Sequence, residues 1–109
     1  MDVHLLLVDD CPHAAAMAAL LRTALDDLGL KRVTFRTTTI ASQSEAEANG
    51  FVGSPTVLLD GHDPFEVPDA RPGLACRVYV TPEGPAGTPT LSALRQALKG
   101  AAQAANTRI

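Results

Sequence analysis

Apolar runs of strand length alternate along the chain with segments whose apolar residues recur every three or four positions. The first, Val3–Val8, is largely apolar and predicts a strand covered on both faces. Over Pro12–Leu28, methionine, alanine and leucine follow helical spacing, so we expect an amphipathic helix that ends at Gly29. Apolar and polar residues then alternate over Arg32–Thr38, which predicts a second strand with one wetter face.

The second half of the chain continues with shorter elements. Ser42 and Glu45 have the spacing of a capping box, which predicts a short helix. Two further apolar runs predict strands over Thr56–Asp60 and Cys76–Val80, separated by a proline-rich loop at 61–75. Finally, a last helix is expected, with Thr88 as its cap, Pro89 as its first residue, and leucines along one face.

The predicted element order is β-α-β-α-β-β-α, within a single domain over 1–109. Helices join the first three strands, which favours parallel pairing, and a loop joins the last two, which favours antiparallel pairing. We therefore expect an α/β fold with a mixed four-stranded sheet and helices on both faces. The alanine-rich tail, from about 101 to 109, is expected to fray.

Composition narrows the classes of partner and compartment. Of the 109 residues, 46% are hydrophobic and 19% charged, which suits one globular core. The net charge of -3 and the lack of a basic block argue against nucleic acid. No apolar run approaches the ~20 residues of a membrane span, and the start lacks signal-peptide features. We therefore expect a cytoplasmic protein, where cysteines are more often reactive or metal-binding than structural.

A cysteine lies in the connection between the first predicted strand and the first predicted helix. Unpaired backbone N–H groups and the positive end of the helix dipole would stabilise a Cys11 thiolate, and a charged His13 would add to this. Asp9 and Asp10 would oppose it, because like charges repel. The sequence thus points to a reactive thiol, and the alternative is a small buried residue at a helix start.

The chain resembles the thioredoxin-like superfamily in three places. Cys11-Pro12-His13-Ala14 lies at the position of the family's C-x-x-C motif, Ser54-Pro55-Thr56 matches its cis-proline step, and the last helix is similar. The resemblance implies a nucleophilic Cys11, a cis Pro55, and a Ser54 backbone that pairs with an extended substrate. More narrowly, the C-P, G-S-P-T-V and C-R-x-Y motifs resemble small bacterial thioredoxin-like proteins, some of which are labelled alkylmercury lyases.

Ala14 departs from the thioredoxin pattern, because it replaces the second cysteine of the motif. A mixed disulfide on Cys11 would then be released by a small thiol such as glutathione or mycothiol, or by Cys76. In the simple fold Cys76 begins the fourth strand at the end of the sheet away from Cys11, and the loop at 61–75 could change that. The alternative for Cys76 is plain core packing. Arg77 and Tyr79 share a strand face, as part of a cleft or as a surface pair.

Together these observations predict thiol–disulfide exchange without a bound cofactor, acting on a small thiol or a protein disulfide. Cys11 and Cys76 are the candidate catalytic residues. A thiol site for a soft metal or organomercury, formed by Cys11, His13 and Cys76, is the first alternative. A non-catalytic interaction module of the same fold is the second. The oligomeric state is not predicted. The candidate substrate-binding residues are Pro12, His13, Ser54, Pro55 and Thr56.

Overall fold

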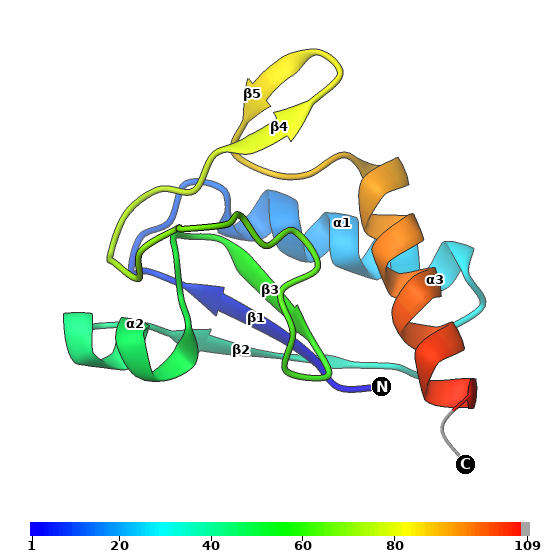
Figure 1. The fold of residues 1–109 in the computed structure, drawn as a ribbon. Coiled ribbons are helices and arrows are strands. Elements are labelled where there is room, and N and C mark those ends of the chain that lie inside the picture. The colour runs from blue at the N-terminus through cyan, green and yellow to red at the C-terminus, as the bar shows by residue number, and fades with distance from the viewer. Residues whose placement is uncertain (108–109) are drawn as a thin grey trace.

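The computed structural model describes residues 1–107. These residues form an α/β fold of three helices, a mixed three-stranded sheet and a separate two-stranded hairpin (Figure 1). The fold class is therefore as predicted at the level of α/β, with one more short strand in the order. The elements are β1 (Val3–Leu7), α1 (Ala14–Asp27), β2 (Phe35–Thr39), α2 (Gln43–Asn49), β3 (Thr56–Leu59), β4 (Tyr79–Thr81), β5 (Gly84–Ala86) and α3 (Leu91–Thr107).

The sheet has the order β2-β1-β3. Strand β1 pairs in parallel with β2 and antiparallel with β3, so the prediction of three parallel strands is wrong for the third. The length of the connection explains the difference. Helix α2 has seven residues and rises only about 10 Å, whereas the five-residue β2 is about 17 Å long. Strand β3 therefore starts at the end of the sheet where β2 finishes, and runs back.

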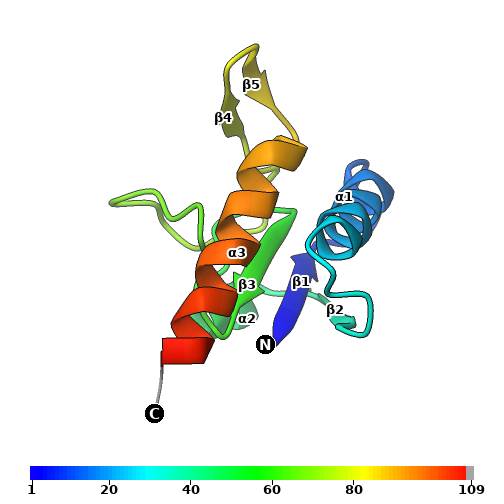
Figure 2. The ribbon, with the colours of Figure 1, turned by 90° about the vertical axis from the view of Figure 1, so that its right-hand side faces the viewer.

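The predicted fourth strand of this sheet is absent from the described residues. The segment expected to form it, Cys76–Val80, contributes only its end to β4, which pairs with β5 in a hairpin that projects beyond the sheet (Figures 1 and 2). Side chains take the place of backbone pairing along β3, since Arg77 donates to the Thr56 hydroxyl and Tyr79 donates to the Pro55 carbonyl. The mixed sheet consequently has three strands rather than four.

Helices cover both faces of the sheet, as predicted. Helices α1 and α3 pack together on one face, and α2 lies on the other. The alternation of side chains along β1 separates the two cores, because successive residues of a strand point to opposite faces. Buried residues of the first core are Val3, Leu5, Leu7, Met17, Leu21, Ala24, Leu25, Val57, Leu59, Leu94 and Leu98; those of the second are Leu6, Ile40, Ala46 and Phe51.

Local signals placed the helix ends with small errors. The Ser42 half of the capping box is confirmed, because the Glu45 N–H donates to the Ser42 hydroxyl at 3.1 Å, while the Glu45 carboxylate accepts from the Ala41 N–H. Helix α1 begins at Ala14, two residues after the predicted Pro12. Helix α3 begins at Leu91 and is capped by Thr90, whose hydroxyl accepts from Ala93 at 3.0 Å, so the predicted cap at Thr88 is wrong.

Helix α3 extends through Thr107, so the segment expected to fray from about 101 continues the helix as far as the structure describes it, and residues 108–109 lie outside the described part. Alanine has the highest helix propensity, and Ala97 and Ala101 pack against the first core. In the part of the chain that the structure describes, no helix combines the length and apolarity needed to cross a bilayer.

Candidate functional site

Cys11 lies in the short connection between β1 and α1 and is partly exposed. Its carbonyl accepts a hydrogen bond from the Ala14 N–H at 3.2 Å, which places the cysteine one turn before the helix. The N-cap residue is His13, whose side chain makes no capping bond, and the first turn holds no acidic residue. The positive end of α1 is therefore not neutralised by a side chain of its own first turn.

The Ser54–Pro55 peptide bond is cis, as the resemblance implied. It lies at the end of the sheet where β1 finishes, since the Ser54 hydroxyl accepts a hydrogen bond from the Val8 N–H at 3.0 Å. Val8 is three residues before Cys11. The cis-proline loop and the cysteine are thus attached to the same end of β1.

Cys76 is held at this same end. The Ser54 N–H donates to the Ala75 carbonyl at 2.8 Å, and the Arg77 N–H donates to the Ser54 carbonyl at 3.0 Å, so Cys76 pairs with Ser54 in a parallel bridge. The loop at 61–75 has carried the chain from the end of the sheet where β3 finishes back to the end where β3 begins, which corrects the expected placement of Cys76 at the far end. Cys76 is exposed, so the core-packing alternative is wrong, and both cysteines are free thiols.

The other predicted substrate-binding residues divide into two groups. Pro12 is exposed and His13 is half-buried beside it. Ser54, Pro55 and Thr56 are buried and hold the loop in shape. The Thr56 hydroxyl, for example, donates to the Gly53 carbonyl at 2.6 Å. Moreover, the Ser54 backbone already pairs within the chain instead of being free for an extended substrate.

A buried ion pair holds the segment that carries Cys76. Arg77 is only 6% exposed, and its guanidinium lies 2.6 Å from a carboxylate oxygen of Asp63. The same group donates to the Phe65 carbonyl and to the Thr56 hydroxyl, and stacks 4.7 Å above the Tyr79 ring. The surface-pair alternative is therefore wrong. We call these contacts of Arg77 with Asp63 and Tyr79 the clamp. The sequence did not predict the clamp, because Asp63 lies in a loop without regular structure.

Gly53 makes the close approach of this segment possible. A Cβ atom at Gly53 would lie 2.9 Å from the Cβ of Arg77 and 3.1 Å from its backbone N and Cα atoms. The φ angle of Gly53 is +141°, a conformation that side chains with a Cβ rarely adopt. The glycine of the G-S-P-T-V motif is thus required by both the backbone and its neighbour.

Tyr79 also contacts the cis-proline loop and Phe65. Its hydroxyl donates to the Pro55 carbonyl, and its ring meets Phe65 edge-on with 5.6 Å between centroids. Burial raises the pKa of the Tyr79 hydroxyl far above its ordinary value of 10.0, and the Arg77 charge opposes this rise.

This raised pKa predicts alkaline unfolding that follows ionisation of the tyrosine. The folded state binds the phenolic proton more tightly than the unfolded state does. The contribution of Tyr79 to the free energy of unfolding is therefore fully present below pH 10.0 and is lost as the pH rises above that value. Tyr79 is the only tyrosine and there is no tryptophan, so the long-wavelength ultraviolet band of tyrosinate reports this group alone. We expect tyrosinate absorbance and loss of circular dichroism to rise together. Reversible ionisation near pH 10.0 with unchanged circular dichroism would contradict the prediction.

A shallow depression joins His13 to Cys76. It has a volume of about 230 Å³, and its remaining lining comes mainly from the hairpin and its return. Gly87 allows this arrangement, because a Cβ atom there would overlap the imidazole of His13. Gly87 was the only feature of the sequence that could have indicated this close packing against His13. The lining residues are His13, Cys76, Arg77, Val78, Pro85, Ala86 and Gly87.

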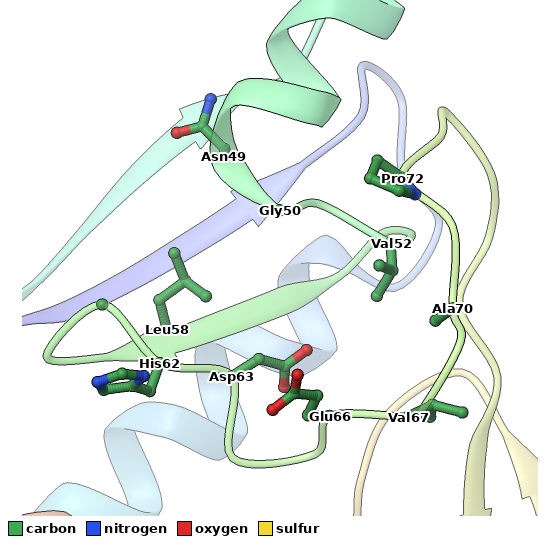
Figure 3. Close-up of a pocket in the computed structure, with 11 residues that line it drawn as sticks. Asn49, Gly50, Val52, Leu58, His62, Asp63, Glu66, Val67, Ala70 and Pro72 are labelled. Carbon is green, nitrogen blue, oxygen red and sulfur yellow. The ribbon is translucent and has the colours of Figure 1, made fainter.

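A second cavity, of about 310 Å³, lies between the end of α2, strand β3 and the loop at 61–75 (Figure 3). The carboxylates of Asp63 and Glu66 point toward one another at its edge. The Asp63 carboxylate is already bound to Arg77. Neither cysteine lines this cavity, so it is separate from the thiol site.

No cluster of three or more histidine, cysteine, aspartate or glutamate side chains with metal-binding proximity occurs among the residues described. Cys11, His13 and Cys76 accordingly do not form a three-ligand site in this arrangement. No protein-family model, curated protein or solved structure matches the chain. Its function is therefore inferred from its own geometry.

Proposed function

We propose that this protein catalyses thiol–disulfide exchange, with Cys11 as the attacking thiol and Cys76 as the second thiol. One observation carries the proposal. The bridge between Ser54 and Cys76 brings an exposed cysteine to the end of β1 from which the chain leads into Cys11. Two free thiols, 65 positions apart in the sequence, are therefore attached to the same end of the sheet, and Cys76 lines a depression with His13.

The architecture supports a thioredoxin-like reading of the fold. Strand β1 lies between a parallel β2 and an antiparallel β3, a cis-proline precedes β3, and helices cover both faces. The start of α1 supports the role of Cys11, because unpaired N–H groups at a helix start favour an adjacent anion.

The proposed reaction has two exchange steps. The Cys11 thiolate attacks one sulfur of a substrate disulfide, the substrate S–S bond breaks, and one substrate thiolate leaves. Cys76, as its thiolate, then attacks the Cys11 sulfur and expels the second substrate thiol. The substrate is reduced to two thiols while Cys11 and Cys76 are oxidised to a disulfide, which an external thiol reduces again. Formation of that disulfide requires the two Cα atoms to come within ~7 Å.

Single-cysteine variants test this assignment. Reduced protein is mixed with bis(2-hydroxyethyl) disulfide, and the products are followed by mass spectrometry. We expect Cys11→Ser to lose the reaction, because the remaining thiol is not the nucleophile. In Cys76→Ser the mixed disulfide on Cys11 should accumulate, since the second step is removed. Both variants replace sulfur with oxygen in a side chain of similar size, so each is a structural control for the other.

The outcomes separate the two roles. Equal activity of Cys11→Ser and the wild type would refute Cys11 as the nucleophile. If Cys76→Ser releases the mixed disulfide at the wild-type rate, Cys76 is not the second thiol. A peptide map of the oxidised wild type should contain a Cys11–Cys76 cross-link.

A further inference from the structure

The chain itself fills the backbone position beside the cis-proline. Ala75 accepts from Ser54 and Arg77 donates to it, at 2.8 Å and 3.0 Å, so both backbone groups of Ser54 are used. Between them stands Cys76, the position that a cysteine in an extended substrate would take. An incoming peptide adds to a sheet edge only where free N–H and C=O groups are available.

This internal strand is firmly attached. The Arg77 side chain is anchored to Asp63 by two hydrogen bonds, at 2.6 Å and 3.3 Å, in a setting where both groups are largely buried. Gly53 lies against the Arg77 backbone with no room for another atom. A peptide would therefore have to break the buried ion pair and two backbone hydrogen bonds before it could pair with Ser54.

The space that remains open is small. The depression between His13 and Cys76 has a volume of about 230 Å³, below the roughly 300–1,000 Å³ typical of pockets for drug-sized ligands. Val78, Pro85 and Ala86 give it an apolar wall. It suits one short substituent of a disulfide and lacks a groove for several residues of peptide.

We propose that the substrate of this site is a low-molecular-weight disulfide and not an extended cysteine peptide, an inference that rests on the proposed exchange activity of Cys11. The Cys11 thiolate attacks one sulfur of the small disulfide, and the other half leaves as a thiolate. The half that stays bonded to Cys11 is released when Cys76, which lines the depression with His13, attacks the Cys11 sulfur. The segment Ala75–Arg77 excludes peptides, because it occupies the backbone N–H and carbonyl of Ser54 with which a peptide would pair.

Three disulfides with the same leaving thiol test the proposal on the wild-type protein. The first is bis(2-hydroxyethyl) disulfide. The second is a five-residue peptide whose central cysteine carries 2-mercaptoethanol as a mixed disulfide. The third is the same peptide with an N-methyl group on the residue after cysteine, whose N–H corresponds to that of Arg77 in the internal strand. The initial rate at which the starting disulfide is consumed is measured for each by mass spectrometry, with Cys11→Ser as the blank, because the small disulfide yields two molecules of 2-mercaptoethanol and each peptide only one.

We expect the small disulfide to react fastest and the two peptides to react more slowly at equal rates. A backbone hydrogen bond contributes about 1 kcal/mol, so a peptide that paired with Ser54 would lose about fivefold on methylation. Such a loss, or a peptide rate that reaches that of the small disulfide, would overturn the proposal. Failure of all three disulfides to react above the blank would instead refute the exchange activity itself.

Discussion

Replacing Asp63 with alanine is expected to lower the free energy of unfolding by about 3 kcal/mol. The substitution removes the counter-charge of the Arg77 guanidinium, which belongs to a side chain that is only 5% exposed in the wild-type protein. An unpaired buried charge costs more than the pair contributes, because the desolvation penalty is no longer offset. Since small domains are stable by only about 5–15 kcal/mol, urea denaturation should detect the loss readily.

Two variants make this measurement specific. Asp63→Asn keeps the shape and one oxygen acceptor for Arg77, so its loss should be smaller than that of alanine. Glu66→Ala removes an exposed carboxylate from the same loop and should leave the unfolding free energy nearly unchanged. Equal denaturation midpoints for Asp63→Ala and Glu66→Ala would show that the ion pair does not hold the loop.

Replacing Gly53 with alanine is expected to cost about 3 kcal/mol and to release the segment that carries Cys76. The backbone conformation at φ +141° contributes about 1–3 kcal/mol of strain once a Cβ is present. In addition, the new Cβ would meet the Arg77 backbone, so the two hydrogen bonds of Ser54 would lengthen or break. Hydrogen exchange should therefore lose protection at the Ser54 and Arg77 amides, alongside the lower stability in urea.

Gly50→Ala separates strain from collision. Gly50 also has a positive φ, of +62°, but no atom lies within 4 Å of the position of an added Cβ. Its substitution should cost about 1–2 kcal/mol and leave the amides of Ser54 and Arg77 protected. If Gly53→Ala and Gly50→Ala have the same effects on stability and exchange, the close approach of Arg77 is not what requires glycine at position 53.

The helices were predictable because their signals are local. The capping box of Ser42 and Glu45 acts within one turn, and the apolar spacing of α1 repeats within the helix. Errors of two residues arose where several residues could serve the same purpose, as with Thr88 and Thr90 at the start of α3. The position of Cys11 before a helix followed from the same local patterns.

Strand pairing was less predictable, because it depends on the end of the sheet at which each connecting segment positions the next strand. Alternation and apolarity indicated β3, but nothing within Thr56–Leu59 states whether its neighbour runs parallel or antiparallel. Likewise, Cys76–Val80 reads as a sheet strand from its composition alone. In the folded protein its backbone pairs with Ser54 and with β5, and the buried side chains of Arg77 and Tyr79 bond to Thr56 and Pro55.

By itself, the sequence determined the helices, the three sheet strands, and a cysteine just before the N-terminus of the first helix. Only the tertiary structure decided that Cys76 comes to the same end of the sheet and that its own segment fills the backbone of Ser54. The physical reason is range. Helix propensity, capping and alternation act over a few residues, whereas positions 54 and 76 pair only once the loop between them has folded and brought Arg77 to Asp63.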